Sequence, residues 1–587
     1  MTFRDRLAVT VFSLLFIAVS AAALASTVVP GEVAGSPEPS VPSGRRYIEG
    51  VLGHATNASP FGARSSADRE LVALLFRGLV RLGPDQSIVG DLASSWETDP
   101  SGATWTFHLR PGLRWQDGAP LTADDVVFTI RALSDPTYDG PGAASWREVT
   151  PVAIDPLTVS LQLATPLGGF LQAATQPIAP KHLLSGIPAA ALSSDPFGQH
   201  PVGSGPFQLL VLDADRAVLD PVAAGDVASP SALASGSAAS GSATAGAAST
   251  PPGLGSTAPN AAFPAPYLPG IEFEYFDDPA AIQAAWARGD LDAASGLAPS
   301  DSATVGASDG ARLVRYPSST LLAVVLNLGA GHTQFADPAV RKALLEAIDR
   351  NAVLAEPLLG FGTVADSLIP PWASEFDPAA SPPVPFDPTA AKAALTAAGW
   401  TQTTTSWIPK GATAPLILSV LSADLATNPI AYATADAVAA AWRAIGLQVN
   451  HESVPAADLV GSRLQPGQFD AAIVPLVIGL DPDLYPLLAS SQTRTGGSNI
   501  SGVQDAALDQ LLAAARAPGT DDQRMASYRA LQQQLSSTLP ILPLAFRDEV
   551  VVFRDTVSGP VPRPIGGPGD RFWDVLTWRL AEAPTSS

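Results

Sequence analysis

Segments with helical periodicity and segments with strand-like alternation follow one another along this chain from Tyr47 onward, separated by proline and glycine. No unit of about 20–50 residues repeats, which excludes a solenoid. The alternation predicts a mixed architecture of several α/β or α+β domains. In the second half of the chain the predicted elements are helices over 338–350, 388–398, 431–445, 506–516 and 522–537, and strands over 312–316, 447–451 and 541–546.

The chain of 587 residues exceeds the length at which a single hydrophobic core stops growing, about 250–300 residues. At least two domains are therefore expected, and an apolar share of 46% is sufficient to fill their cores. The sequence contains no cysteine, which excludes disulfides, thiolate metal sites and a cysteine nucleophile. Packing alone must hold the domains together.

The N-terminus has the features of an export signal. Arg4 and Arg6 precede an uncharged apolar run that ends in small residues at Ala25, the pattern of a cleaved signal peptide over 1–25. The run is also long enough to remain as a transmembrane anchor, and both outcomes stay open. Residues 26–46 are rich in Pro, Ser and Gly and are expected to form a flexible tether. The folded part is thus expected in the periplasm or on the extracellular face of the cytoplasmic membrane.

One internal segment differs sharply in composition from the rest. Residues 222–266 consist almost entirely of Ala, Ser, Gly, Pro and Thr, with too little apolar bulk to offset the entropy of ordering them. They are predicted to form a disordered insertion. The flanking stretches, 205–209 and 271–276, are predicted to be strands of one sheet.

Charge and motifs exclude several classes of function. The net charge of −22 and only four lysines argue against a nucleic-acid partner. No two of the six histidines lie within four residues of each other, and no phosphate-binding or dinucleotide-binding glycine motif occurs. We therefore expect neither a metal site nor a cofactor.

A serine hydrolase is the enzymatic alternative, because Gly306–Gly310 matches G-x-S-x-G around Ser308. A nucleophile elbow requires an apolar strand before the serine and a helix after it. Here the preceding residues, 301–304, are polar and the following ones, 312–316, have the pattern of a strand. A polar turn is the better interpretation of Ser308.

A series of motifs in a fixed order is far more specific. The quoted stretches are 79–82 (LVRL), 91–97 (DLASSWE), 105–126 (WTFHLRPGLRWQDGAPLTADDV), 203–207 (GSGPF), 289–292 (GDLD), 340–350 (VRKALLEAIDR) and 386–400 (FDPTAAKAALTAAGW). Together they resemble the family 5 extracellular solute-binding proteins, the dipeptide, oligopeptide and nickel receptors of ABC importers. The resemblance extends over about 47–580.

The resemblance implies an α/β, two-lobed periplasmic-binding-protein-like fold (type II, cluster C) with an extra subdomain. The implied division is lobe I over 47–92, 191–276 and 486–587, the extra subdomain over 93–190, and lobe II over 277–485. The implied function is that of an exported monomeric receptor without catalytic activity, which closes around a peptide-like or other small solute and delivers it to ABC permease subunits. A solute sensor without a permease is the other alternative.

The resemblance also suggests where the solute binds. In similar peptide receptors an aspartate pairs with the peptide's α-amino group, and aligning the pair Asp481–Pro482 places Ile478 at that position and Pro475 at that of a cleft tryptophan. The run containing Leu476 and Val477 then suggests an apolar cleft wall and an apolar or N-blocked solute, although a buried strand has the same appearance. On the opposite lobe the expected ligand-binding residues are Asn57, Ser59, Phe61 and Asn499, and surface turns would look the same.

Overall fold

The computed structural model describes residues 44–222, 266–493 and 497–581. The predicted signal peptide or anchor over 1–25, nearly all of the predicted tether and all but the two end residues of the insertion predicted over 222–266 lie outside the described residues. Across the described ranges, no helix combines the length and the apolar character needed to cross a bilayer.

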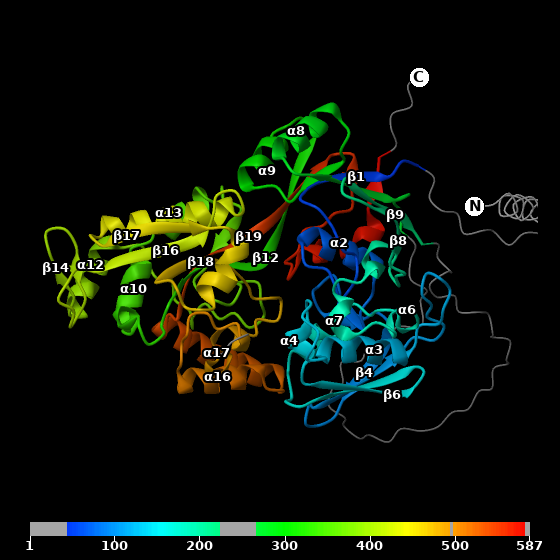
Figure 1. Ribbon diagram of the computed structural model, residues 1–587, viewed down its shortest axis with the longest axis horizontal. Coiled ribbons are helices and arrows are strands. Elements are labelled where there is room, and N and C mark those ends of the chain that lie inside the picture. The colour runs from blue at the N-terminus through cyan, green and yellow to red at the C-terminus, as the bar shows by residue number, and fades with distance from the viewer. Residues whose placement is uncertain (1–43, 223–265, 494–496, 582–587) are drawn as a thin grey trace, which may run out of the picture. The chain divides into compact units, whose positions relative to one another are not determined.

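A single sheet of 11 strands runs through the described residues (Figure 1). Its spatial order is β17 (Gln448–Val454), β16 (Ile417–Ala423), β18 (Ala471–Val477), β12 (Ala311–Leu326), β19 (Ile541–Arg554), β11 (Ala293–Ser295), β1 (Tyr47–Leu52), β10 (Ile271–Phe276), β9 (Arg216–Pro221) and β8 (Phe207–Leu212), with β13 (Gly362–Val364) paired to β19.

The long antiparallel pair of β12 and β19 connects the two halves of this sheet. Ala311 at the start of β12 pairs with Arg554 of β19, which lies beside β11. Val325 near the end of β12 pairs with Ile541 of β19 on one side and with Ala472 of β18 on the other. The register shifts between Pro317 and Leu321. Each strand therefore belongs to both halves, and the ladder is irregular where it passes from one to the other.

The half built on β16–β18 is covered by helices on both faces. Leu322 and Val324 of β12 point into one core and Leu321 and Ala323 into the other, so the last part of this strand, 321–326, is apolar at every position. The first core is closed by α10 (Pro338–Glu346), α11 (Arg350–Ala355), α12 (Pro388–Ala397) and α13 (Pro429–Ala444), and the second by α15 (Tyr485–Leu488), α16 (Ala506–Arg516) and α17 (Asp521–Thr538).

The other half carries α2 (Ser66–Leu75) and a separate four-stranded antiparallel sheet. That sheet has the order β4 (Ala93–Thr98), β5 (Thr104–Leu109), β7 (Thr158–Leu163) and β6 (Val149–Asp155). The helix α3 (Ala123–Ser134) packs on it, and residues such as Phe107 and Ile130 join one core with those of β1 and α2. The smaller helices here are α4 (Ala143–Trp146), α5 (Phe170–Ala173), α6 (Lys181–Leu184) and α7 (Ala189–Leu192).

Short elements complete the fold. They are the strand pairs β2 (Val80–Leu82) with β3 (Ile88–Gly90), β14 (Thr401–Gln402) with β15 (Trp407–Ile408) and β20 (Val557–Ser558) with β21 (Arg579–Leu580), and the helical turns α14 (Ala456–Asp458), η1 (Pro196–Gln199), η2 (Thr333–Phe335), η3 (Leu459–Leu464), η4 (Ser490–Gln492), η5 (Pro568–Phe572) and η6 (Val575–Thr577).

Packing divides the chain differently from the predicted lobe boundaries at 277 and 485. α8 (Pro279–Arg288) and α9 (Pro299–Gly306) form a small core beside β1, and α16 and α17 pack in the core of the β18 half. The reason is the path of the chain, which enters the β18 half only along β12 and leaves it only along β19. Sequence motifs cannot locate a domain boundary at which the chain passes from one half of the sheet to the other within a continuous strand.

Local predictions are largely confirmed, with one difference. The helix predicted over 338–350 is interrupted after Glu346, because Asp349 accepts hydrogen bonds from the backbone N–H groups of Asn351 and Ala352 and caps a second helix. The strands predicted on either side of the insertion do lie in one sheet, as β8 and β10 with β9 between them.

A buried ionic cluster ties the C-terminal segment to the start of the chain. The Arg571 guanidinium, 2% exposed, lies 2.6 Å from a Glu49 carboxylate oxygen and 2.7 Å from one of Glu70. Tyr47 donates its hydroxyl proton to Glu49 at 2.7 Å. Burial raises the pKa of Glu70, and the Arg571 charge opposes that rise. The cluster joins η5, β1 and α2, so it positions η5 against α2.

Replacing Arg571 with Met is expected to leave both carboxylates buried and uncompensated, which should lower the free energy of unfolding by about 3–5 kcal/mol. Urea unfolding followed by circular dichroism measures it. Arg288→Met is the control, because Arg288 and its partner Asp290 are 62% and 44% exposed and this pair should contribute less than about 1 kcal/mol. Equal effects of the two substitutions would contradict the assigned role of the cluster.

Candidate ligand-binding site

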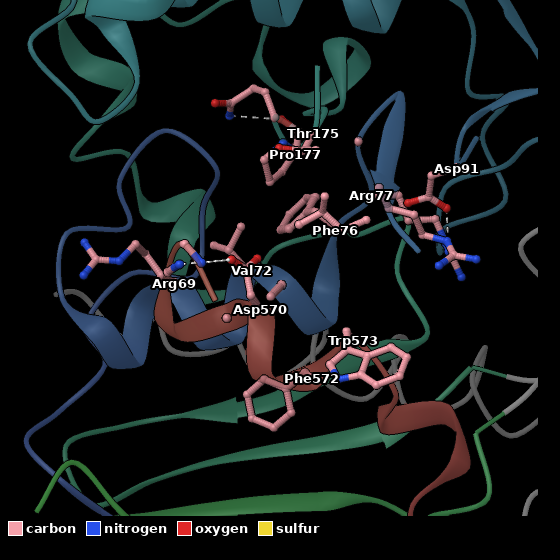
Figure 2. A pocket seen from close by; sticks show the side chains of 18 of the residues that line it. Arg69, Val72, Phe76, Arg77, Asp91, Thr175, Pro177, Asp570, Phe572 and Trp573 are labelled. Atoms are coloured by element: carbon pink, nitrogen blue, oxygen red, sulfur yellow. Dashed lines mark hydrogen bonds and ion pairs between the residues drawn. The ribbon is translucent and has the colours of Figure 1, made fainter. Parts of the chain in front are cut away.

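A cavity of about 890 Å³ lies beside α2 (Figure 2). Four stretches far apart in sequence contribute most of its lining, namely parts of 60–91, 141–177, 479–481 and 561–577. Such a volume is in the range of sites for small organic solutes. The cavity is therefore the candidate binding site.

The apolar wall comes from α2 and the C-terminal segment that packs against it. Figure 2 shows Val72 of α2 with Phe76, the residue that follows this helix, and Phe572 of η5 with Trp573, the residue that follows it. The helix begins at a capping box formed by Ser65 and Asp68. Local sequence thus sets the start of the helix, and the Arg571 cluster sets its distance from η5.

Three polar side chains of the lining have their partners within the protein. Arg77 forms an ion pair with Asp91 at 2.8 Å, and both side chains are almost fully buried. The carboxylate of Asp570 accepts hydrogen bonds from the N–H groups of Gly566 and Gly567 at 2.9 and 3.0 Å. Burial raises the pKa of Asp570. These groups shape the site and are already satisfied.

Arg563 differs from them. It lies in the cavity wall, its guanidinium is 4.6 Å from the centre of the Trp573 ring, and its Nη1 donates to the carbonyl oxygen of Gly83. Its buried Nε has no hydrogen-bond partner.

The loop after β18 closes another side of the cavity through Asp481. Its carboxylate lies 2.6 Å from Arg524, which also pairs with Glu375 at 2.7 Å. Burial raises the pKa of the Asp481 carboxyl above its usual value, and the positive charge of Arg524 offsets only part of that rise. Because Asp481 has a cationic partner of its own, it is not a free counter-charge for a ligand amine.

The backbone at 168–169 closely approaches both the Asp481 side chain of this loop and the end of α16. A β-carbon built on Gly169 would lie 1.4 Å from Asp481 Oδ2, and the N–H of Gly168 donates to the carbonyl oxygen of Arg516 at 2.8 Å. Only glycine leaves room for the Asp481 carboxylate at this position.

Of the residues predicted from the β18 region, Asp481 alone lines the cavity. Leu476 and Ile478 are buried in the core of the β18 half, whereas Pro475 and Val477 point to the other face, where Val477 is 65% exposed. The apolar run is thus a strand with pairing partners on both sides, β16 and β12, and only alternate residues near its end are exposed.

The residues predicted on the opposite side take part in internal contacts. Asn57 accepts a hydrogen bond from the N–H of Ser59, itself buried, and donates to the carbonyl oxygen of Ser193, and Phe61 is fully buried against aromatic rings. Asn499 donates to three backbone carbonyl oxygens, those of Leu488, Ala489 and Val503. None of the four lines the cavity, although the neighbouring Pro60 and Ala63 do.

The sequence predictions missed the contribution of 561–577. This segment supplies Arg563, Asp570 and Trp573. The available signal was its Gly- and Pro-rich stretch with interspersed charged and aromatic residues, a composition that also occurs in ordinary surface loops.

Ser308 lies in an exposed turn between α9 and β12, the reverse of a strand–serine–helix order. Its side chain forms no hydrogen bond with any residue in the described ranges. The turn interpretation is therefore the one that the local structure supports.

A serine–histidine–aspartate arrangement exists elsewhere. Ser422 Oγ lies 2.9 Å from His451 Nε2, and His451 Nδ1 lies 2.8 Å from Asp436 Oδ1. Ser422 is completely buried and donates its hydroxyl proton to the carbonyl oxygen of Ala423. A nucleophile must reach its substrate, so we assign this triad to holding β16, β17 and α13 together. Among the described residues no cluster of three or more potential ligands is arranged to hold a metal ion.

Solved structures share this architecture. The oligopeptide-binding protein AppA from Bacillus subtilis, in complex with a nonapeptide, has a TM-score of 0.71 at 21% identity, covering 91% of this chain and 99% of that one. NikZ from Campylobacter jejuni, in complex with Ni(L-His), has a TM-score of 0.70 at 22% identity, with coverages of 91% and 99%. The fold is that of a two-lobed, mixed α/β periplasmic binding protein of type II.

The sequence comparison defines the family. A model described as bacterial extracellular solute-binding proteins, family 5 middle, matches residues 87–499. The glutathione-binding protein GsiB from Escherichia coli O1:K1 is 23% identical over 526 residues, 88% of this chain and 91% of the relative. The chain belongs to the family 5 bacterial extracellular solute-binding proteins, receptors that bind a solute for an ABC importer.

Replacing Gly169 with Ala is expected to separate the 168–169 backbone from Asp481 and to lower the free energy of unfolding by about 1–3 kcal/mol, the usual cost of overpacking. Gly186→Ala is the matched control, because a β-carbon there meets no atom within 4 Å. Adding Asp481→Ala to Gly169→Ala removes the obstructing oxygen. In urea unfolding the double variant should thus lose less than the sum of the single variants, and strict additivity would contradict the contact.

Proposed function

We propose that this chain is the exported receptor of an ABC importer and that its solute occupies the cavity beside α2. The observation that carries this proposal is the composition of the cavity lining, because α2, the C-terminal segment and the loop after β18 contribute to one cavity. A solute there contacts segments from both halves of the large sheet, so its binding energy favours the arrangement in which these segments meet.

The β12–β19 ladder supports a hinged closure. These two strands carry the chain between the halves of the sheet, and their register shifts between Pro317 and Leu321. A short irregular stretch can absorb changes in backbone angle with little loss of hydrogen bonding. We place the two lobes on either side of this stretch, with 93–190 as the extra subdomain and with the boundaries shifted to the crossing within β12 and β19.

The expected solute is peptide-like, with a blocked or absent α-amino group. Asp481 is paired with Arg524, and Ile478 lies in a core, so neither supplies a free carboxylate for an ammonium group. The wall formed by Val72, Phe76 and Trp573 favours apolar groups. Relatives bind glutathione, a nonapeptide or Ni(L-His), which leaves the solute of a family member open.

Export, a permease partner and the lack of catalysis complete the proposal. Arg4, Arg6 and the apolar run that follows them support export to the outer face of the cytoplasmic membrane or the periplasm. A monomer would deliver the solute to permease subunits without changing it. Transport into vesicles distinguishes this receptor from the alternative, a solute sensor without a permease. A receptor that serves a permease stimulates uptake of its solute into vesicles that contain that permease, whereas a sensor does not.

N-blocked peptides are expected to bind at least about tenfold more tightly than their free-amine counterparts, because a buried ammonium group would lack a partner. Isothermal titration of the folded protein with N-acetyl-trialanine and with trialanine measures this ratio. Tighter binding of trialanine would contradict the proposed solute class.

Filling the cavity tests its role directly. Ala73 lines the cavity on α2, and Ala73→Trp is expected to weaken binding of N-acetyl-trialanine at least about tenfold. Ala507→Trp is the matched control, since Ala507 is an exposed helical alanine of α16 outside the lining. If both variants bind equally well while folded, the solute binds elsewhere.

A further inference from the structure

Arg563 is a buried arginine with an unused hydrogen-bond donor in the wall of the cavity. The residue is 8% exposed. Its Nη1 donates to the carbonyl oxygen of Gly83, its Nε is buried without a partner, and it forms no ion pair with any other described residue. A guanidinium removed from water without a counter-ion is costly, and burial correspondingly lowers the pKa of Arg563.

Other buried arginines of the described ranges are compensated. Arg571 faces two carboxylates, Arg77 pairs with Asp91, and Arg341 donates to four backbone carbonyl groups. Two further arginines have an unpartnered Nε, Arg516 and Arg547, but each forms an ion pair with a carboxylate and neither lines the cavity. The missing partner of Arg563 is thus a specific feature of this cavity.

The nearest acidic side chains do not supply the partner. Asp570 and Asp574 act on Arg563 through their charge, yet neither forms an ion pair with it. Asp570 accepts from two backbone N–H groups. Asp574 accepts from the Trp578 indole at 2.7 Å and from the N–H of Val561 at 2.8 Å.

A second cation lies in the same lining. Arg81, on β2, is exposed and forms no hydrogen bond or ion pair within the described part of the chain. Its charge opposes that of Arg563, so an anion between them would relieve the repulsion.

We propose that Arg563, assisted by Arg81, binds a carboxylate group of the solute. This inference rests on the proposed function and specifies the chemical class of its solute, a monoanionic, carboxylate-bearing, peptide-like molecule. The centre of the Trp573 ring lies 4.6 Å from the guanidinium, and the N–H donors of Arg563 that Gly83 does not use can pair with a carboxylate oxygen. The charges of Asp570 and Asp574 disfavour a dianion such as a phosphate group.

The first test changes only the ligand, so it does not depend on a variant that folds. N-acetyl-trialanine and its C-terminal amide are titrated into the unaltered protein by calorimetry. The acid is expected to bind about 10- to 100-fold more tightly than the amide, the range for a hydrogen-bonded charged group. Equal binding of acid and amide would overturn the carboxylate assignment and leave the proposed receptor function standing. If neither ligand binds, the peptide-like solute and this inference both fail.

The second test places the effect on Arg563. Arg563→Gln should abolish the preference for the acid over the amide while the amide still binds as before. Arg554→Gln is the matched control, because Arg554 also lies over an indole ring, that of Trp286 at 4.3 Å, and donates to backbone carbonyl groups outside the cavity. A preference that persists in Arg563→Gln, or inorganic phosphate that competes as well as the acid, would overturn the proposal.

Discussion

The pairing of β12 with β19 is the interaction on which the rest of this structure depends. The two strands form an antiparallel ladder that runs, with register shifts, from the edge of β11 to the edge of β18, so each half of the large sheet is completed by the same pair. Because the backbone hydrogen-bonding groups of buried strands must be paired, the cores on either side both depend on this ladder.

Ionic contacts then place the cavity walls. The Arg571 cluster holds η5 against β1 and α2, and the Asp481–Arg524–Glu375 network holds the loop after β18 in place. Buried charges of this kind add little net stability, but they penalise any arrangement that separates the partners. They therefore define the geometry of the site more than they strengthen the fold. Arg563 differs from these paired charges, because it lies in the cavity wall and forms no ion pair with any other described residue.

Only part of the cavity lining could be predicted from the sequence. The resemblance to peptide receptors, through the pair Asp481–Pro482, brought Asp481 into the predicted site, and Asp481 lines the cavity. Leu476 and Ile478 follow the same apolar run but turn into the core, since successive side chains of a strand point to opposite faces. Arg563 was not predicted, because nothing in its sequence neighbourhood distinguishes an arginine with an open donor from one on the surface.

Sequence alone determined the class of fold, the family and most helix and strand positions. Periodicity, proline and glycine placement and capping residues such as Thr122 and Asp387 act within a few neighbouring residues. The tertiary structure alone decided where the chain crosses between the halves of the sheet, which polar groups are buried, and which distant segments share the cavity. These features depend on strand order and on contacts between residues hundreds of positions apart, such as Arg571 with Glu49, and no local pattern encodes them.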